Sequence, residues 1–258
     1  MSKVAGSLHI ETPEFQADVK EKTVKWDREW CEYFQYPYAN RFFYHMRGPD
    51  RKIWVDTNEL RKYSPRDFYF TKPFGEYQFE TWTYGEDIIG KTVLEVGSGP
   101  GAFGRVAAKL AKSYVGIDYS PLALHVGRTV SDENAEYIHI SNLDRIKQLR
   151  GTFDIAIGRH FFIHQNVDNV RWLLELYHFG LKDGGTAVLD FWLHPVGTPI
   201  KDVNIFDGMG KIPEEYASCV YYFAPQVIEE LVAKAGFQIE TSEVVPEVDR
   251  RFVRIRKV

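Results

Sequence analysis

Residues Val93 to Gly101 read Val-Leu-Glu-Val-Gly-Ser-Gly-Pro-Gly, and this stretch decides the fold. Its apolar half is too short for a helix and is ended by glycines, so it predicts a buried strand followed by a tight turn. After the turn, apolar residues recur at helical spacing at Phe103, Val106, Ala107 and Leu110. The stretch therefore predicts a strand, a glycine turn and a helix that form one unit.

The glycine turn predicts a ligand site when it is combined with a second acidic strand. Glycines tolerate positive φ and let the main chain approach a ligand, and a helix amino end offers unpaired N–H groups. An ordinary turn that binds nothing has the same glycines, so the prediction depends on the residues downstream. The next predicted strand, Tyr114 to Asp118, ends in a carboxylate 17 residues beyond Gly101. An acid at about this spacing suits a ribose diol.

These two units resemble the class I S-adenosylmethionine-dependent methyltransferases. The first motif of that family reads acidic-x-Gly-x-Gly-x-Gly, which Glu95, Gly97, Gly99 and Gly101 match, and its second-strand acid corresponds to Asp118. A dinucleotide-binding enzyme is the alternative. It fits less well because its fingerprint has two residues, and not one, between the last two glycines.

The resemblance implies S-adenosylmethionine as the cofactor. The position of Asn142 usually holds an aspartate in this family, and that aspartate accepts a hydrogen bond from the adenine amino group. Asparagine departs from the pattern but keeps an acceptor oxygen. The implied cofactor-binding residues are Glu95, Gly97, Ser98, Gly99, Gly101, Asp118, Tyr119, Asn142, Leu143 and Arg159.

The predicted fold class is α/β, with a Rossmann-like, seven-stranded, mostly parallel sheet, helices on both faces and an aromatic-rich N-terminal helical cap. The core is expected at residues 88–258. Further strands are predicted at 135–140, 153–158, 186–192, 237–244 and 252–255. One helix is expected to begin at an Asp168 N-cap and to close at Gly184-Gly185. Another is expected to begin at Pro225 and to end at Gly236.

Two segments outside this core are candidates for covering the site. Residues 1–87 are expected to form a tail and a cap, with a helix from Glu14 to Tyr36. Between Trp26 and Tyr84 lie 19 of the 39 aromatic residues of the chain. They either pack the cap onto the core or also wall a pocket for an apolar or aromatic substrate. Residues 193 to about 220 are either a substrate lid or a plain surface excursion.

His160 and His164 are the candidate catalytic residues because they come after the fourth strand, 153–158, and histidine titrates near neutral pH. A base is needed only if the methyl acceptor is a hydroxyl or a protonated amine. For a neutral amine, positioning alone suffices. The family often carries a histidine near His164 for packing and capping, so that residue also has a structural interpretation.

Composition narrows the function classes. The chain has 258 residues, a formal net charge of −4 and a pI near 6.1, which disfavours a general polyanion binder. Its two cysteines, Cys31 and Cys219, have no metal-ligand spacing, so we expect no metal and a reduced, cytoplasmic setting. No apolar run is long enough to span a membrane, and the first twenty residues do not read as a signal peptide. The expected partner is a small-molecule acceptor, with no nucleic acid and no membrane.

The leading function is O- or N-methylation of a small molecule. A nucleic-acid or protein methyltransferase is the second candidate. The acidic total opposes it, and so does the run Arg159-His160-Phe161-Phe162, which stands where an Asn/Asp-Pro-Pro-Tyr-type motif would be expected. The third candidate is a relative that keeps the fold and cofactor but transfers no methyl group, and no sequence feature excludes it.

Overall fold

The computed structural model describes residues 8–35, 85–193, 217, 221–245 and 250–258. The predicted cap beyond residue 35 and most of the predicted lid lie outside these residues. The proposed division of the chain at residue 87 therefore stays a prediction.

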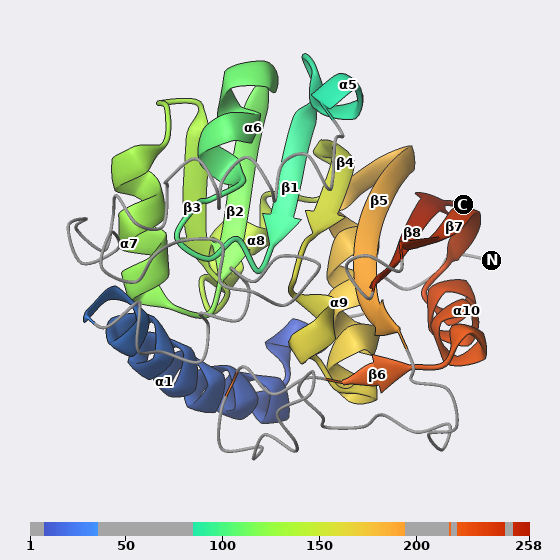
Figure 1. Ribbon diagram of the computed structural model, residues 1–258, viewed down its shortest axis with the longest axis horizontal. Coiled ribbons are helices and arrows are strands. Elements are labelled where there is room, and N and C mark those ends of the chain that lie inside the picture. Colours follow the sequence, from blue (N-terminus) through green and yellow to red (C-terminus); the bar gives the residue numbers. More distant parts are fainter. Residues whose placement is uncertain (1–7, 36–84, 194–216, 218–220, 246–249) are drawn as a thin grey trace.

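A mostly parallel sheet forms the centre of the molecule (Figure 1). Its strands lie in the order β3-β2-β1-β4-β5-β8-β7, and β6 pairs with β5. Paired strands run parallel except for β8, which is antiparallel to both β5 and β7. This order confirms the predicted Rossmann-like fold, with one short additional strand. The strands are β1 Thr92–Val96, β2 Ser113–Asp118, β3 Ala135–His139, β4 Phe153–Gly158, β5 Leu181–Leu193, β6 Tyr222–Phe223, β7 Phe237–Val245 and β8 Arg250–Lys257.

Helices cover both faces because the inner strands are apolar on both sides, as buried parallel strands are. Along β1, Leu94 and Val96 join an apolar core shared with Leu173 of α9, whereas Val93 joins a second core shared with Ala107 of α6. The helices are η1 His9–Glu11, α1 Pro13–Gln35, α5 Gly85–Ile88, α6 Gly104–Leu110, α7 Pro121–Val130, α8 Leu143–Lys147, η3 Phe162–His164, α9 Val167–Gly180 and α10 Pro225–Lys234.

The bounds of α9 and β5 differ from the prediction. Asn166, and not Asp168, is the N-cap of α9, because its backbone is extended and its side chain accepts from the Asn169 amide at 2.9 Å. The helix ends at Gly180, and Gly184 and Gly185 lie within β5. Gly184 has φ +74° in the stretch where the pairing of β5 with β4 shifts register. The glycine pair therefore accommodates a β-bulge and does not close a helix.

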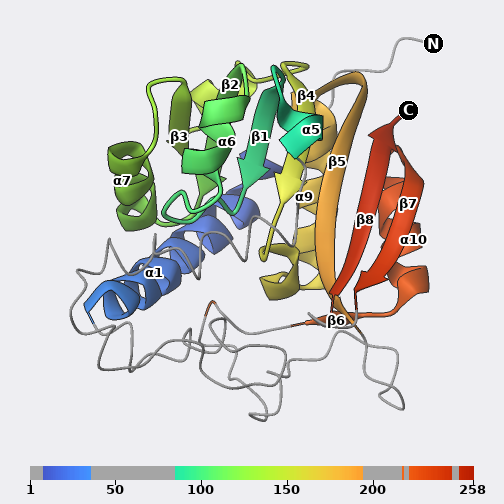
Figure 2. The same ribbon diagram turned by 45° about the horizontal axis from the view of Figure 1, so that its top comes forward.

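Helix α1 crosses the carboxyl ends of the parallel strands, as Figure 2 shows. Thr23 Oγ1 lies 3.2 Å from His139 Nε2 at the end of β3, and the Lys22 ammonium lies 5.5 Å from the centre of the Tyr119 ring, just after β2. Asp27 binds the amino end of α7, where its Oδ1 accepts from the Leu122 amide at 3.2 Å and from the Ser120 hydroxyl. Open α/β sheets bind ligands at this edge, so α1 lies over the predicted site.

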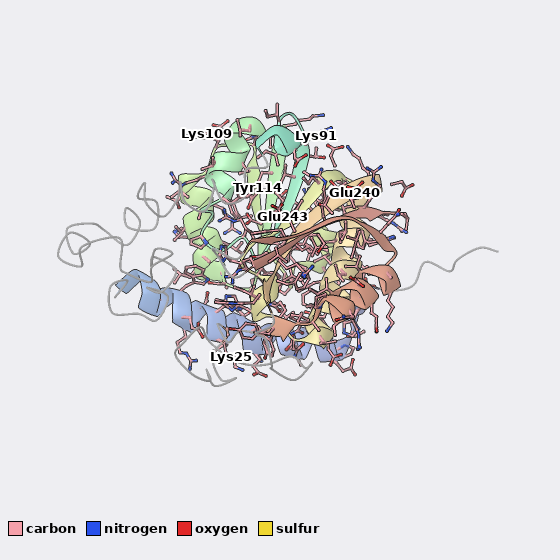
Figure 3. The ribbon with its side chains drawn as sticks, turned by 45° about the vertical axis from the view of Figure 1, so that its right-hand side comes forward. Lys25, Lys91, Lys109, Tyr114, Glu240 and Glu243 are labelled. Atoms are coloured by element: carbon pink, nitrogen blue, oxygen red, sulfur yellow. The ribbon has the colours of Figure 1, made fainter. Side chains whose placement is uncertain are left out.

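The opposite edge of the sheet carries ordinary surface groups. Figure 3 shows Lys91 and Lys109 at the end of the molecule away from α1, which carries Lys25, while Tyr114 lies inside. None of the helices in the described ranges is both long and apolar enough to cross a membrane.

Replacing Asp27 by alanine removes both hydrogen bonds that tie α1 to α7. We expect the free energy of unfolding to fall by about 1–2 kcal/mol, the usual cost of losing a helix N-cap. Glu21→Ala is the matched control on the same helix, because Glu21 is exposed and forms an ion pair with Lys25, four residues on. That change is expected to cost less than about 0.5 kcal/mol. Denaturant unfolding of both variants measures the difference, and equal losses would contradict the anchoring role.

Candidate active site

The glycine turn after β1 has the backbone that only glycine adopts easily. Gly97, Gly99 and Gly101 have φ of +79°, +52° and +79°. A Cβ added to Gly97 would also lie 2.2 Å from the Phe161 side chain, which comes after β4. The first glycine of the motif is therefore required both by its φ and by the close approach of an aromatic ring.

Asp118, at the end of β2, is held by the same turn. Its Oδ2 accepts from the Gly99 amide at 2.8 Å, and its Oδ1 accepts from the Ser120 amide at 2.9 Å. A carboxylate has about four acceptor positions, so at least one remains for a ligand hydroxyl. Burial raises the pKa of Asp118 to about 6, although backbone hydrogen bonds from Ser120, Gly99 and Tyr119 favour the ionised form.

Glu95, the acid of the first motif, is buried inside the fold. It accepts a hydrogen bond from the hydroxyl of Tyr114 on β2. Burial raises its pKa to about 7, and the guanidinium of Arg159 acts in the opposite direction. Arg159 is itself buried, with its guanidinium carbon 5.0 Å from the centre of the Phe103 ring behind the glycine turn. Glu95 and Arg159 are thus buried next to the turn, where their opposite charges attract each other.

Three buried side chains at this edge have polar atoms without a hydrogen-bond partner among the described residues. They are the Ser98 hydroxyl in the turn, the Tyr119 hydroxyl after Asp118, and both amide atoms of Gln165 after η3. Leaving such groups buried and unpaired costs about 1–3 kcal/mol each. The two nearest the turn, Ser98 and Tyr119, fit a polar ligand held between the glycines and Asp118, as S-adenosylmethionine would be.

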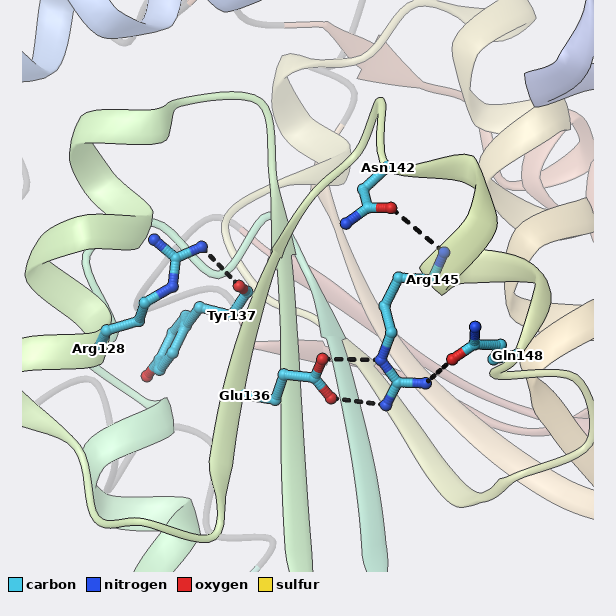
Figure 4. A network of polar contacts seen from close by, with 6 residues as sticks. All are labelled: Arg128, Glu136, Tyr137, Asn142, Arg145 and Gln148. Carbon is cyan, nitrogen blue, oxygen red and sulfur yellow. Dashed lines mark hydrogen bonds and ion pairs between the residues drawn. The ribbon is translucent and has the colours of Figure 1, made fainter.

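Asn142 and Leu143 come after β3, as predicted, but they serve α8 in this structure. The Asn142 side chain accepts from the Arg145 amide at 3.2 Å and so caps the helix (Figure 4). The guanidinium of Arg145 binds Glu136 through two hydrogen bonds of 2.7 Å. Leu143 packs against the larger apolar core. The capping bond uses one of the two acceptor positions of the Asn142 oxygen, so the other remains for the predicted bond from the adenine amino group.

His160 lies beyond the end of β4 in a conformation unusual for a residue other than glycine, with φ +50°. Its backbone amide donates to Asp190 Oδ1 at 3.0 Å, and its Nδ1 lies 3.3 Å from Arg250 Nη2. Its neighbour Phe161 touches Gly97. The fold thus brings His160 to the glycine turn.

His164 is placed differently. Its side chain is buried in η3, and its ring meets Trp26 of α1 edge-on with 5.6 Å between the ring centres. This contact supports the packing interpretation of His164. The two predicted catalytic histidines are therefore not equivalent.

Sequence reasoning missed the two charged residues beside His160. Asp190 is fully buried in β5, where burial raises its pKa to about 6 and the charge of Arg250 opposes that rise. Arg250 begins β8, pairs with Trp192 across the strands and lies 4.0 Å from the centre of its ring. The one available signal was an acid inside the apolar run Ala187 to Trp192.

Comparison with known proteins bears out the predicted family. Residues 71–242, more than half of the chain, match the methyltransferase domain family. The chain belongs to that family. The predicted class I S-adenosylmethionine-dependent methyltransferase is thereby confirmed at the level of the family.

Sequence similarity to other methyltransferases covers only part of this chain. An uncharacterised methyltransferase of Mycobacterium sp. (strain JLS) is 31% identical over 129 residues, which cover 49% of this chain and 50% of that protein. The ribosomal protein L11 methyltransferase of Photobacterium profundum is 37% identical over 121 residues, 42% of this chain and 37% of that protein. The chain spans about half the length of the first curated relatives it matches.

A solved structure shares the fold across nearly the whole methyltransferase. The 1,6-didemethyltoxoflavin-N1-methyltransferase of Burkholderia thailandensis has a TM-score of 0.53 and 16% identity, covering 99% of this chain and 93% of that one. This likeness supports the architecture alone. Within the described ranges no group of three or more His, Cys, Asp or Glu side chains is placed to hold a metal ion.

Gly97→Ala is expected to weaken binding of S-adenosylhomocysteine at least about tenfold, or 1.4 kcal/mol. The new methyl group would displace Phe161 from its place beside the turn. Gly90→Ala is the matched control, because Gly90 also has positive φ (+67°) but nothing lies within 4 Å of its added Cβ. It should lose about 1–2 kcal/mol of stability through backbone strain and keep its affinity. Calorimetry measures both, and wild-type affinity in Gly97→Ala would contradict the close approach.

Affinity for the same ligand is expected to fall as the pH falls through about 6, the pKa of Asp118. Protonation removes an acceptor from the carboxylate, so the ionised form binds a diol better. Below that pKa the loss approaches about tenfold per pH unit. Asp118→Asn should bind the ligand weakly, because its NH2 group replaces a carboxylate oxygen that accepts from a backbone amide. Its affinity should not depend on pH near 6, because asparagine does not titrate there. Titration calorimetry across the pH range tests this, and a flat wild-type profile would refute it.

Proposed function

We propose that this methyltransferase transfers the methyl group of S-adenosylmethionine to an oxygen or nitrogen atom of a small molecule. The observation that carries the proposal is the Asp118 carboxylate. It is fixed by the Gly99 and Ser120 amides beside a positive-φ glycine turn and still has acceptor capacity for a ribose hydroxyl. This is the arrangement that a nucleoside-containing cofactor requires.

The residues of the chain would hold the cofactor and exclude water. When bound, S-adenosylmethionine supplies an electrophilic methyl group on a sulfonium. Methyl transfer is an in-line displacement, so the protein contributes mainly position and a dry enclosure. Phe161 and Tyr119, both buried and 6.3 Å apart between ring centres, supply aromatic walls next to the turn. Ser98 and Tyr119 offer their unpartnered hydroxyls to the polar parts of the ligand.

The position of helix α1 over the edge of the sheet supports a small acceptor. Helix α1 lies across the strand ends and is tied to them by Thr23, Trp26 and Asp27, which restricts the approach of a large polymer. The net charge of −4 disfavours nucleic acid. The structurally similar Burkholderia thailandensis enzyme has a small molecule, 1,6-didemethyltoxoflavin, bound beside S-adenosylhomocysteine.

A protein acceptor is the second candidate, and one observation favours it. The relative with 37% identity over 121 residues is a ribosomal protein L11 methyltransferase. That segment covers less than half of each chain, so it supports a shared domain more strongly than a shared substrate. A cytoplasmic location also stays a prediction.

The test is to supply cofactor with a labelled methyl group to three separate fractions of a cell extract: metabolites, proteins and nucleic acids. We expect label in the metabolite fraction, with the product identified by mass spectrometry. Asp118→Ala should lose most of this activity, because each lost charged hydrogen bond is worth roughly 1.5–3 kcal/mol. Glu21→Ala, which changes only an exposed ion pair with Lys25, is the control that should retain it.

The other outcomes separate the alternatives. Label confined to the protein fraction would replace the small-molecule proposal by the second candidate. Cofactor binding without label in any fraction would point to a relative that transfers no methyl group.

A further inference from the structure

Three residues beside the glycine turn, His160, Asp190 and Arg250, are joined in a closed ring of hydrogen bonds. Asp190 Oδ1 accepts from the His160 backbone amide at 3.0 Å, and Asp190 Oδ2 accepts from Arg250 Nε at 3.3 Å. Arg250 Nη2 lies 3.3 Å from His160 Nδ1 and closes the ring. Asp190 and the Arg250 side chain are almost fully buried, and the Arg250 guanidinium also stacks on Trp192. The ring fixes both the backbone and the imidazole of His160.

The guanidinium decides which imidazole nitrogen carries the proton. Arginine has five N–H donors, no acceptor, and is not deprotonated in proteins. The contact between Nη2 and Nδ1 is therefore a hydrogen bond only if the arginine donates and Nδ1 of His160 is unprotonated. In a neutral imidazole the proton then lies on Nε2. Protonating Nδ1 as well would break this bond and place a second cation against the guanidinium.

The backbone of His160 is strained, and the hydrogen bonds to Asp190 and Arg250 hold it in that conformation. A residue other than glycine at φ +50° is strained, and such residues persist only where their surroundings determine them. The buried Asp190 carboxylate binds the amide of this residue directly. The strained residue is adjacent to Phe161, which touches Gly97 of the cofactor turn.

We propose that Arg250, held by Asp190, is a positioning residue that locks His160 as its Nε2–H tautomer, so that His160 takes no proton from the methyl acceptor. This inference rests on the proposed methyl transfer at the same site. Nε2 already carries a proton, and Nδ1 is engaged by the arginine. The acceptor is then either nucleophilic as bound, such as a carboxylate oxygen or an uncharged nitrogen, or it gives its proton to a group other than His160. A hydroxyl that must lose its proton to His160 is excluded.

The tautomer is measured directly by long-range 1H–15N correlation spectra of the full chain with labelled histidine, without cofactor or acceptor. His139 provides an internal reference for the Nε2–H form. Its Nε2 lies 2.7 Å from the Tyr119 carbonyl, which only accepts, and its Nδ1 accepts from the Ser141 amide. We expect His160 to show the same pattern as His139. A proton on Nδ1 at neutral pH, alone or with one on Nε2, overturns the proposal.

Two arginine variants test the cause. Arg250→Met removes the donor, and the His160 signals should shift toward those of an imidazole that exchanges between tautomers. Arg251→Met is the matched control, because Arg251 is the next residue of β8 and bonds instead to Ser242 at 2.8 Å. It should leave the His160 pattern unchanged. An unchanged pattern in folded Arg250→Met would show that another contact sets the tautomer, which overturns the role of the arginine. If Arg250→Met does not fold, the wild-type spectrum still shows whether Nδ1 of His160 carries a proton.

Turnover separates positioning from base catalysis once the acceptor is identified. His160→Asn keeps a side-chain oxygen for Arg250, and asparagine tolerates positive φ, but it is not a base. We expect a loss below about tenfold, whereas loss of a general base costs roughly 10²–10⁴-fold. A loss in that larger range overturns the proposal.

Failure here is distinguishable from failure of the proposed function. A His160 locked as Nε2–H in a chain that binds no S-adenosylmethionine would refute only the methyl transfer. Cofactor-dependent methylation with a proton on Nδ1 would refute only the tautomer lock.

Discussion

The hydrogen bond from the Gly99 amide to the Asp118 carboxylate joins the ends of two neighbouring strands, and the rest of the site depends on it. Because β1 and β2 pair in parallel, the turn after one strand and the acid ending the other meet at the same edge. The carboxylate fixes the turn, and the turn orients the carboxylate.

The same edge extends to the N-terminal helix. The amide of Ser120 binds Asp118, and its hydroxyl binds Asp27 of α1, so one residue links the cofactor acid to the helix lying over it. A change at Asp27 therefore alters the surroundings of Ser120, whose amide binds Asp118.

Burial concentrates ionisable groups around the turn. Burial raises the pKa of Glu95, Asp118 and Asp190 above the usual value of a carboxyl group. Glu95 is bound by a tyrosine, Asp118 by backbone amides, and Asp190 by an arginine together with the His160 amide. Groups of this kind cluster at functional sites because their desolvation is costly and is retained only where it serves binding or chemistry. The three carboxylates therefore differ mainly in the groups that donate hydrogen bonds to them.

The glycine spacing and the second-strand acid by themselves determined the fold and the position of the cofactor turn. Both are local signals, since positive φ and strand period are properties of adjacent residues. The later strands were also predicted from their apolar runs. The end of α9 was not, because a bulge in β5 depends on the partner strand and uses glycines as a helix end does.

Only the tertiary structure decided how the candidate side chains are used. His160 and His164 both follow the fourth strand in sequence, yet one is bound by Asp190 and Arg250, which lie 30 and 90 residues away, and the other packs on Trp26. Asn142, which matches a cofactor position of the family, also caps α8, and its cofactor role stays a prediction. Side-chain roles depend on contacts between distant segments, and those contacts exist only once the sheet has brought the strand ends together.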